Sequence, residues 1–146
     1  MLAVVAGQII TLSDVTAARD LGLQTPGSAT DPVRVVLSRL IDRELVLSEV
    51  DRYAPPEPPG EAIDREIDAI RARFPSADAL AETLARSGLD DRHLREIVRQ
   101  DLRIRGYELQ RFASADPVRR QTLIDEWVAG LRRRADVIDL YLATKD

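Results

Sequence analysis

The sequence predicts a mainly α-helical fold with a small β-element at the chain ends. A compact bundle of about five helices is expected, because capping residues and prolines separate a series of amphipathic stretches. β-branched runs stand out at the two ends, where residues 3–11 and 136–142 are expected to pair as short strands. A chain of 146 residues with 45% hydrophobic content predicts one domain over residues 1–146, with one modest core.

Residues 31–52 form the predicted central helix of the bundle. Asp31 is a good N-cap, and Pro32 occupies the first helical position, where its missing N–H removes no hydrogen bond. Apolar residues cover most of the helix and leave a narrow polar seam, so neighbours are expected on more than one side. Glu44 interrupts the apolar arc, and a structural ion pair or extension of its carboxylate toward solvent is more typical than a catalytic role.

The N-terminal segment predicts a small hairpin or a bent strand, followed by a short helix. Two β-branched runs in residues 2–12 flank Ala6-Gly7, a pair that suits a type II turn better than the primed turns of tight hairpins. Ser13 is the expected N-cap of a helix over residues 14–21, and Gly22 is the expected residue after its end.

The rest of the chain predicts a stiff connector, four helices and a final strand. Residues 54–60 hold four prolines in seven positions, which favours an extended connector internal to the domain. The connector lacks the flanking basic residue of a proline-rich ligand motif. Helices are expected over residues 61–74, 77–87, 91–112 and 117–134, and the final strand places Ile138, Leu140 and Leu142 on one side.

Composition and charge exclude several classes of function. A net charge of -4, from 21 basic and 25 acidic residues, gives no field that would attract nucleic acid. Interleaved acids dilute the arginines of the predicted helix 91–112, which predicts a solvated face. There are no cysteines, so disulfides and thiolate chemistry are excluded. No apolar run reaches the roughly 18 residues that span a bilayer, so no membrane insertion is expected.

The residues also offer little for catalysis or for holding a cofactor. His93 is the only histidine and is expected to face solvent near a helix start. Trp127 is a possible ligand platform, but at the centre of a helical apolar stripe it is more typical of a core anchor. No nucleotide-binding, metal-binding or hydrolase motif is present. The sequence therefore predicts a non-enzymatic protein without metal or cofactor.

Five strings, in order, resemble the N-terminal chaperone domain of the SurA family of bacterial periplasmic folding factors. The strings carry mainly hydrophobic spacing around a Leu-Ile-Asp and a Gly-Leu turn, and together they cover nearly the whole chain. They are VVAGQIITLSDV at 4–15, LSRLIDRELVLSEVDR at 37–52, EAIDREIDAI at 61–70, LARSGLDDRHLREIVRQDLRIRGYE at 84–108 and WVAGLRRRADVIDLY at 127–141.

The resemblance implies an ATP-independent holdase that binds unfolded or extended envelope and outer-membrane polypeptides in an apolar groove. The chain has no room for the parvulin-type module that family members usually carry, so prolyl isomerase activity is not expected. The resemblance implies a periplasmic location. The N-terminus lacks the basic and apolar regions of a signal peptide, so we expect either a cytoplasmic protein or a start after a targeting segment.

The predicted peptide-binding surface consists of apolar residues on the helices after the connector. The competing interpretation is that these residues pack on one another and on residues 31–52. A different class of function also fits: a helical docking module with one dedicated folded partner, or one that forms homodimers through the last helix and strand. The eight predicted peptide-binding residues are Ile63, Ile67, Ile70, Phe74, Leu80, Leu84, Tyr107 and Phe112.

Overall fold

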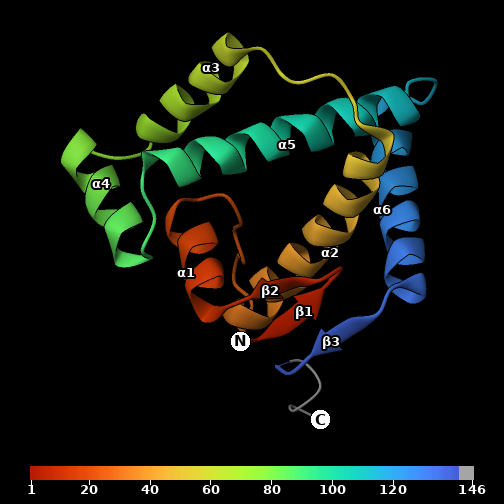
Figure 1. Ribbon diagram of the computed structural model, residues 1–146, viewed down its shortest axis with the longest axis horizontal. Helices are drawn as coiled ribbons and strands as arrows, with labels where there is room; N and C mark the ends of the chain where they lie inside the picture. Colours follow the sequence, from red (N-terminus) through yellow and green to blue (C-terminus); the bar gives the residue numbers. More distant parts are fainter. Residues whose placement is uncertain (142–146) are drawn as a thin grey trace.

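The computed structural model describes residues 1–141 and places six helices and one three-stranded sheet in this part of the chain (Figure 1). The prediction of a mainly helical fold with a small β-element is confirmed. No helix within residues 1–141 has the length and apolar character that crossing a membrane requires. The strands are β1 (Ala3–Val5), β2 (Gln8–Ile10) and β3 (Val137–Asp139), and the helices are α1 (Leu12–Asp20), α2 (Pro32–Tyr53), α3 (Gly60–Arg71), α4 (Ala77–Arg86), α5 (Asp91–Arg111) and α6 (Pro117–Arg134).

Helix α2 lies at the centre of the fold, as predicted. The Asp31 carboxylate accepts a hydrogen bond of 3.1 Å from the backbone N–H of Arg34, and Pro32 begins the helix. Helices α1, α5 and α6 and strands β1 and β2 all contact α2, so it is surrounded on several sides. The helix ends at Tyr53 because Ala54 adopts a left-handed conformation, with φ of 45°, before the prolines.

The two chain ends meet in one antiparallel sheet with strand order β2-β1-β3, which confirms the predicted pairing. Val4, at the middle of β1, lies opposite Ile9 on one neighbour and Ile138 on the other. Ala3 and Val5 point to the core, whereas Ile9 and Ile138 are about 60% exposed on the other face. Leu140 is also exposed, and Leu142 lies outside the described residues.

The hairpin turn differs from the predicted type II turn. Ala6 and Gly7 both have positive φ angles, of 49° and 79°, which is the pattern of a type I′ turn. A type I′ turn follows the right-handed twist of the two strands, and the short pairing leaves no room for a looser connection. The strand geometry therefore holds an alanine in a conformation that glycine normally occupies.

Helix α1 begins earlier than predicted, and Thr11 rather than Ser13 is its N-cap. The Thr11 hydroxyl accepts a hydrogen bond from the backbone N–H of Asp14, and the Asp14 carboxylate accepts one of 2.8 Å from the backbone N–H of Thr11. This reciprocal capping box makes the earlier start more favourable, because it satisfies two end groups at once. Gly22 follows the helix with φ of 71°, as expected for the residue after a helix end.

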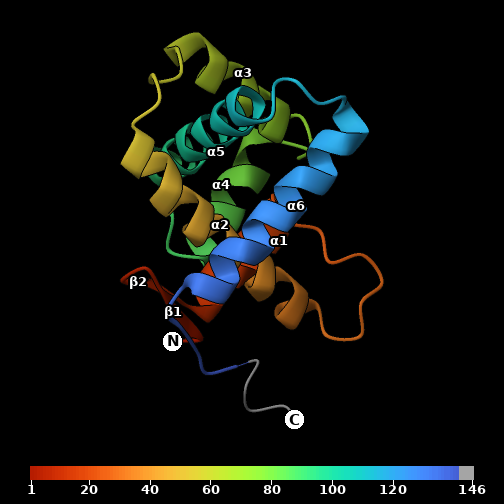
Figure 2. The same ribbon diagram turned by 90° about the vertical axis from the view of Figure 1, so that its right-hand side faces the viewer.

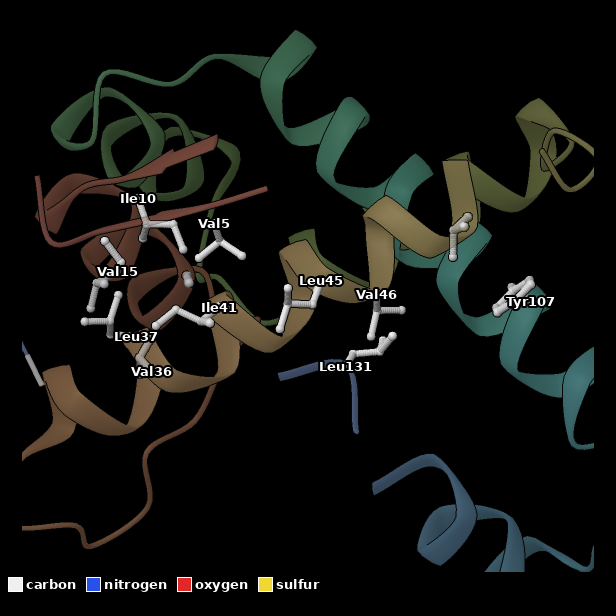
Figure 3. Packing of buried hydrophobic residues seen from close by; sticks show 13 residues of the cluster. Val5, Ile10, Val15, Val36, Leu37, Ile41, Leu45, Val46, Tyr107 and Leu131 are labelled. Carbon is white, nitrogen blue, oxygen red and sulfur yellow. The ribbon is translucent and has the colours of Figure 1, made fainter. Parts of the chain in front are cut away.

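The buried apolar residues form two clusters instead of the single core that the composition suggested. The main cluster joins the sheet, α1 and α2 to Tyr107 of α5 and Leu131 of α6 (Figure 3). The second cluster joins α3, α4 and the first half of α5 to Leu21, and it contains no residue of α2. Helices α3 and α4 therefore bury their apolar stripes on α5 and on the end of α1.

The arginine-rich face of α5 is largely exposed, as the sequence predicted, but several of its arginines form ion pairs with neighbouring elements. Arg99 donates to both carboxylate oxygens of Glu57 in the connector, at 2.9 and 2.8 Å, and Arg103 is paired with Asp51 at 2.8 Å. Arg95 and Arg105 pair with acids of α3. The sequence did not show these ion pairs, because the acids belong to α2, α3 and the connector and not to α5 itself.

Replacing Ala6 by glycine should stabilise the protein. We expect Ala6→Gly to raise the free energy of unfolding by about 0.5 kcal/mol, because the left-handed conformation costs alanine more than the chain entropy that glycine adds to the unfolded state. Ala69→Gly, on the exposed face of α3, should instead lower it by about 1 kcal/mol. Urea unfolding of both variants measures the difference. A loss of stability in Ala6→Gly would contradict the strain assigned to this turn.

Candidate functional site

The eight residues predicted to bind peptides do not form one exposed surface. Ile63, Ile67, Ile70, Leu80 and Leu84 are between 3 and 8% exposed and pack with half-buried Phe74 in the second cluster. This agrees with the interpretation that they pack on one another, but their partner is α5 and not α2. Tyr107 is 7% exposed in the main cluster, and half-buried Phe112 contacts Trp127 nearby. Peptide binding by these residues remains a prediction.

An open cleft lies between α2, α5 and α6. Figure 2 shows α6 crossing in front of α2. The volume of the cleft is about 710 Å³. Both apolar and charged side chains line it. The apolar residues are Leu23, Val46, Ile104, Val128 and Ala129, and the charged ones are Arg39, Asp42, Arg43, Asp101, Arg105, Glu108, Asp125 and Arg132.

Two ion pairs connect the walls of the cleft to α2. Arg43, with 16% of its side chain exposed, donates from Nε to a carboxylate oxygen of Asp101 on α5 at 3.0 Å. Arg132 of α6 donates from Nη1 to a carboxylate oxygen of Asp42 at 2.8 Å. Partly buried pairs of this kind fix geometry more than they add stability. They therefore set the spacing of the three helices that line the cleft.

Two carboxylates of the cleft have no cationic partner within residues 1–141. Glu108 on α5 is half-buried, and burial raises the pKa of its carboxyl group. The charge of Asp125 on α6 raises the pKa of Glu108 further, which indicates that the two acids lie near each other. Asp125 accepts a hydrogen bond of 2.9 Å from the side-chain amide of Gln121. Glu108 and Asp125 therefore form a pair of neighbouring acids in a cleft whose other two acids belong to ion pairs.

A second, smaller hollow of about 240 Å³ adjoins the cleft between β2, α1, α2 and α5. Leu23, Gln24, Arg43 and Asp101 line both spaces, so the Arg43–Asp101 pair lies between them. The smaller hollow is lined mostly by aliphatic side chains, and Glu44 is among its polar residues. Burial raises the pKa of Glu44, although Arg43, whose guanidinium lies 3.9 Å from the Glu44 carboxylate, acts in the opposite direction. The expected ion pair of Glu44 is present.

Four of the aromatic residues form a row where α2, α5 and α6 meet. Tyr53, which is 60% exposed, stacks on Tyr107 with ring centroids 5.5 Å apart. Tyr107 contacts Trp127 at 5.7 Å, and Phe112 meets Trp127 edge-on at 6.0 Å. Trp127 packs against the main cluster, which confirms its prediction as a core anchor. The exposed part of the Tyr53 ring forms an aromatic surface next to the connector.

The only histidine belongs to a helix cap. His93 is exposed, and its Nδ1 lies 2.7 Å from a carboxylate oxygen of Asp90. A hydrogen bond from the backbone N–H of His93 lowers the pKa of the Asp90 carboxyl group, as expected for an N-cap. In the part of the chain that the structure describes, no three histidine or carboxylate side chains converge as metal ligands.

The residues of the cleft were not singled out by the sequence as a site. Ile104, Glu108, Asp125 and Val128 occupy positions where periodicity alone gives either a core contact or a solvated face. Glu108 follows Ile104 by one helical turn, and Asp125 precedes Val128 by almost one, so each acid borders an apolar residue on its own helix. This pattern marks the border of an apolar face, but it does not show that two such borders lie opposite each other.

The raised pKa of Glu108 predicts a specific pH dependence of stability. Above the ordinary value of 4.5, the unfolded state holds an ionised glutamate, whereas the folded state disfavours this charge, so the destabilisation grows as the pH rises toward the folded-state pKa. Glu108→Gln should therefore stabilise the protein more at pH 7 than at pH 4 in urea unfolding. Glu126→Gln, on the exposed face of α6, is the control. An equal effect of Glu108→Gln at both pH values would contradict the assignment.

Comparison of the chain with family models, curated proteins and solved structures finds no match. The likeness to the SurA family is thus carried by the five quoted strings.

Proposed function

We propose that this protein is an ATP-independent holdase that binds extended segments of unfolded polypeptides in the cleft between α2, α5 and α6. The observation that carries the proposal is the cleft itself, whose lining combines apolar and charged side chains. Unfolded chains expose apolar side chains next to polar backbone, and a cleft of this composition can contact both. Such contacts are weak and exchange rapidly, which suits a protein that must release its clients without ATP.

The resemblance to the SurA family supports the same proposal from the sequence. It suggests clients among envelope and outer-membrane polypeptides, and it suggests a periplasmic location. We propose that these 146 residues bind clients without prolyl isomerase activity, because no segment of them matches a parvulin-type module. The exposed ring of Tyr53, beside the connector, provides a further aromatic contact for an extended segment.

Blocking the cleft tests this function directly. Ala129 is exposed in the cleft, and the chain contains no cysteine, so Ala129→Cys accepts a bulky maleimide at one position. The labelled variant should lose at least about fivefold in its ability to slow aggregation of an unfolded outer-membrane protein, since the label occupies the space of the client. The unlabelled variant should keep this ability.

The control is Ala69→Cys on the exposed face of α3, labelled in the same way. Because Ala69 lies outside both hollows, the labelled control should remain active. Amide NMR titration with an unfolded fragment should give graded shifts at residues 101–108 and 121–132. Equal activity of both labelled proteins would overturn the assignment of the cleft. Shifts confined to α3 and α4 would favour the eight residues predicted from the sequence.

A second candidate function is a docking module that pairs with its own copy through the sheet. Ile9, Val4 and Ile138 form a row on the face of the sheet that points away from the core, and Ile9 and Ile138 are about 60% exposed. The strand β3 lies at one end of the strand order. A second copy offers the same strand and the same apolar row, so the contact would be self-complementary.

This candidate predicts concentration-dependent dimers in sedimentation velocity experiments. Ile138→Lys should abolish them, because it places a charge in the centre of the contact. Val118→Lys changes a residue that is 80% exposed at the start of α6 and should leave the dimers unchanged. A monomer at all concentrations would exclude this function.

A further inference from the structure

The basic side chains that line the cleft all have partners within the protein, whereas two of the acidic ones do not. This difference bears on the kind of polypeptide that binds there. Arg43 and Arg132 pair with carboxylates of the cleft, and Arg105 pairs with Glu66 on α3 at 3.2 Å. Arg39 donates a hydrogen bond to the backbone carbonyl of Thr25. Each guanidinium of the cleft is therefore already bonded to an acceptor of the protein.

Only two of the four carboxylates that line the cleft have a cationic partner. Asp42 and Asp101 belong to the two ion pairs that connect the helices. Glu108 and Asp125 have no arginine or lysine partner within residues 1–141, although both line the cleft and Glu108 is half-buried. The molecule as a whole is also acidic, with a net charge of -4. A cation from outside would therefore relieve the repulsion between these two carboxylates.

We infer that the cleft selects extended segments in which a lysine or arginine stands next to an apolar residue. The inference rests on the proposed function and names the class of segment that is bound. The apolar side chain packs on Ile104 and Val128, which are half-buried and keep part of their surface open. The aliphatic stem of the basic residue lies along the same apolar surface, and its charged end reaches the carboxylates of Glu108 and Asp125.

Charge complementarity favours a basic polypeptide over the other cations that two carboxylates attract. A divalent metal would need further oxygen or nitrogen ligands, and no third carboxylate or histidine joins Glu108 and Asp125 in the described part of the chain. The apolar residues beside the two acids, Ile104 and Val128, have no use in metal binding. They fit the stem of a lysine or arginine and its apolar neighbour. Recognition of one side chain also leaves the rest of the segment free to vary, as a holdase requires.

A matched pair of peptides tests the inference. Both are short, unstructured and fluorescein-labelled, with the same leucines, and one carries lysines where the other carries glutamines. Fluorescence anisotropy with the full chain should give about fivefold tighter binding of the lysine peptide, as expected for a partly desolvated charge contact. Added salt should reduce this preference. In the Glu108→Gln/Asp125→Asn double variant, the two peptides should bind with equal affinity.

The control variant removes the same charge outside the cleft. Glu61→Gln/Glu126→Gln changes two exposed acids that line neither hollow, so it should keep the preference for the lysine peptide. Equal binding of both peptides by the unaltered protein would overturn the inference and leave the proposed function intact. A preference that persists in Glu108→Gln/Asp125→Asn would also overturn it. Absence of binding by either peptide would overturn the proposed function and the inference with it.

Discussion

The burial of α2 on several sides is the constraint on which the rest of the structure depends. The sheet, α1, α5 and α6 all contact this one helix. Four of its side chains are completely buried: Val36, Leu37, Ile41 and Val50. Burial of apolar surface is the dominant favourable contribution to folding. The two ends of the chain are therefore drawn together, and β3 closes the sheet next to β1.

The same helix also explains why a cleft is left open. Helices α5 and α6 pack on α2 through Tyr107 and Leu131, while Arg43 pairs with Asp101 of α5 and Arg132 of α6 pairs with Asp42. These contacts hold the three helices at a fixed spacing. The cleft between them is lined by both apolar and charged side chains.

Helices α3 and α4 form a different kind of surface from the one that their sequence suggested. Their apolar stripes match the first half of α5, and ion pairs from Asp64 and Glu66 surround this contact. The connector is held along α5 by the bidentate contact of Glu57 with Arg99. An apolar stripe is necessary for a peptide-binding helix, but it is equally the pattern of a helix that packs on its neighbour. The sequence alone does not distinguish the two.

The sequence by itself determined the order of the helices, the caps of α2, α5 and α6 and the pairing of the chain ends, because these depend on local patterns. Asp31 with Pro32, Asp90 and Asp116 mark helix starts through contacts within one turn, and the β-branched runs have few alternative partners. Only the tertiary structure decided which apolar stripes are closed, which acids meet the arginines of α5, and that Glu108 and Asp125 border one cleft. These features depend on the crossing of helices far apart in the sequence, and periodicity contains no information about such distances.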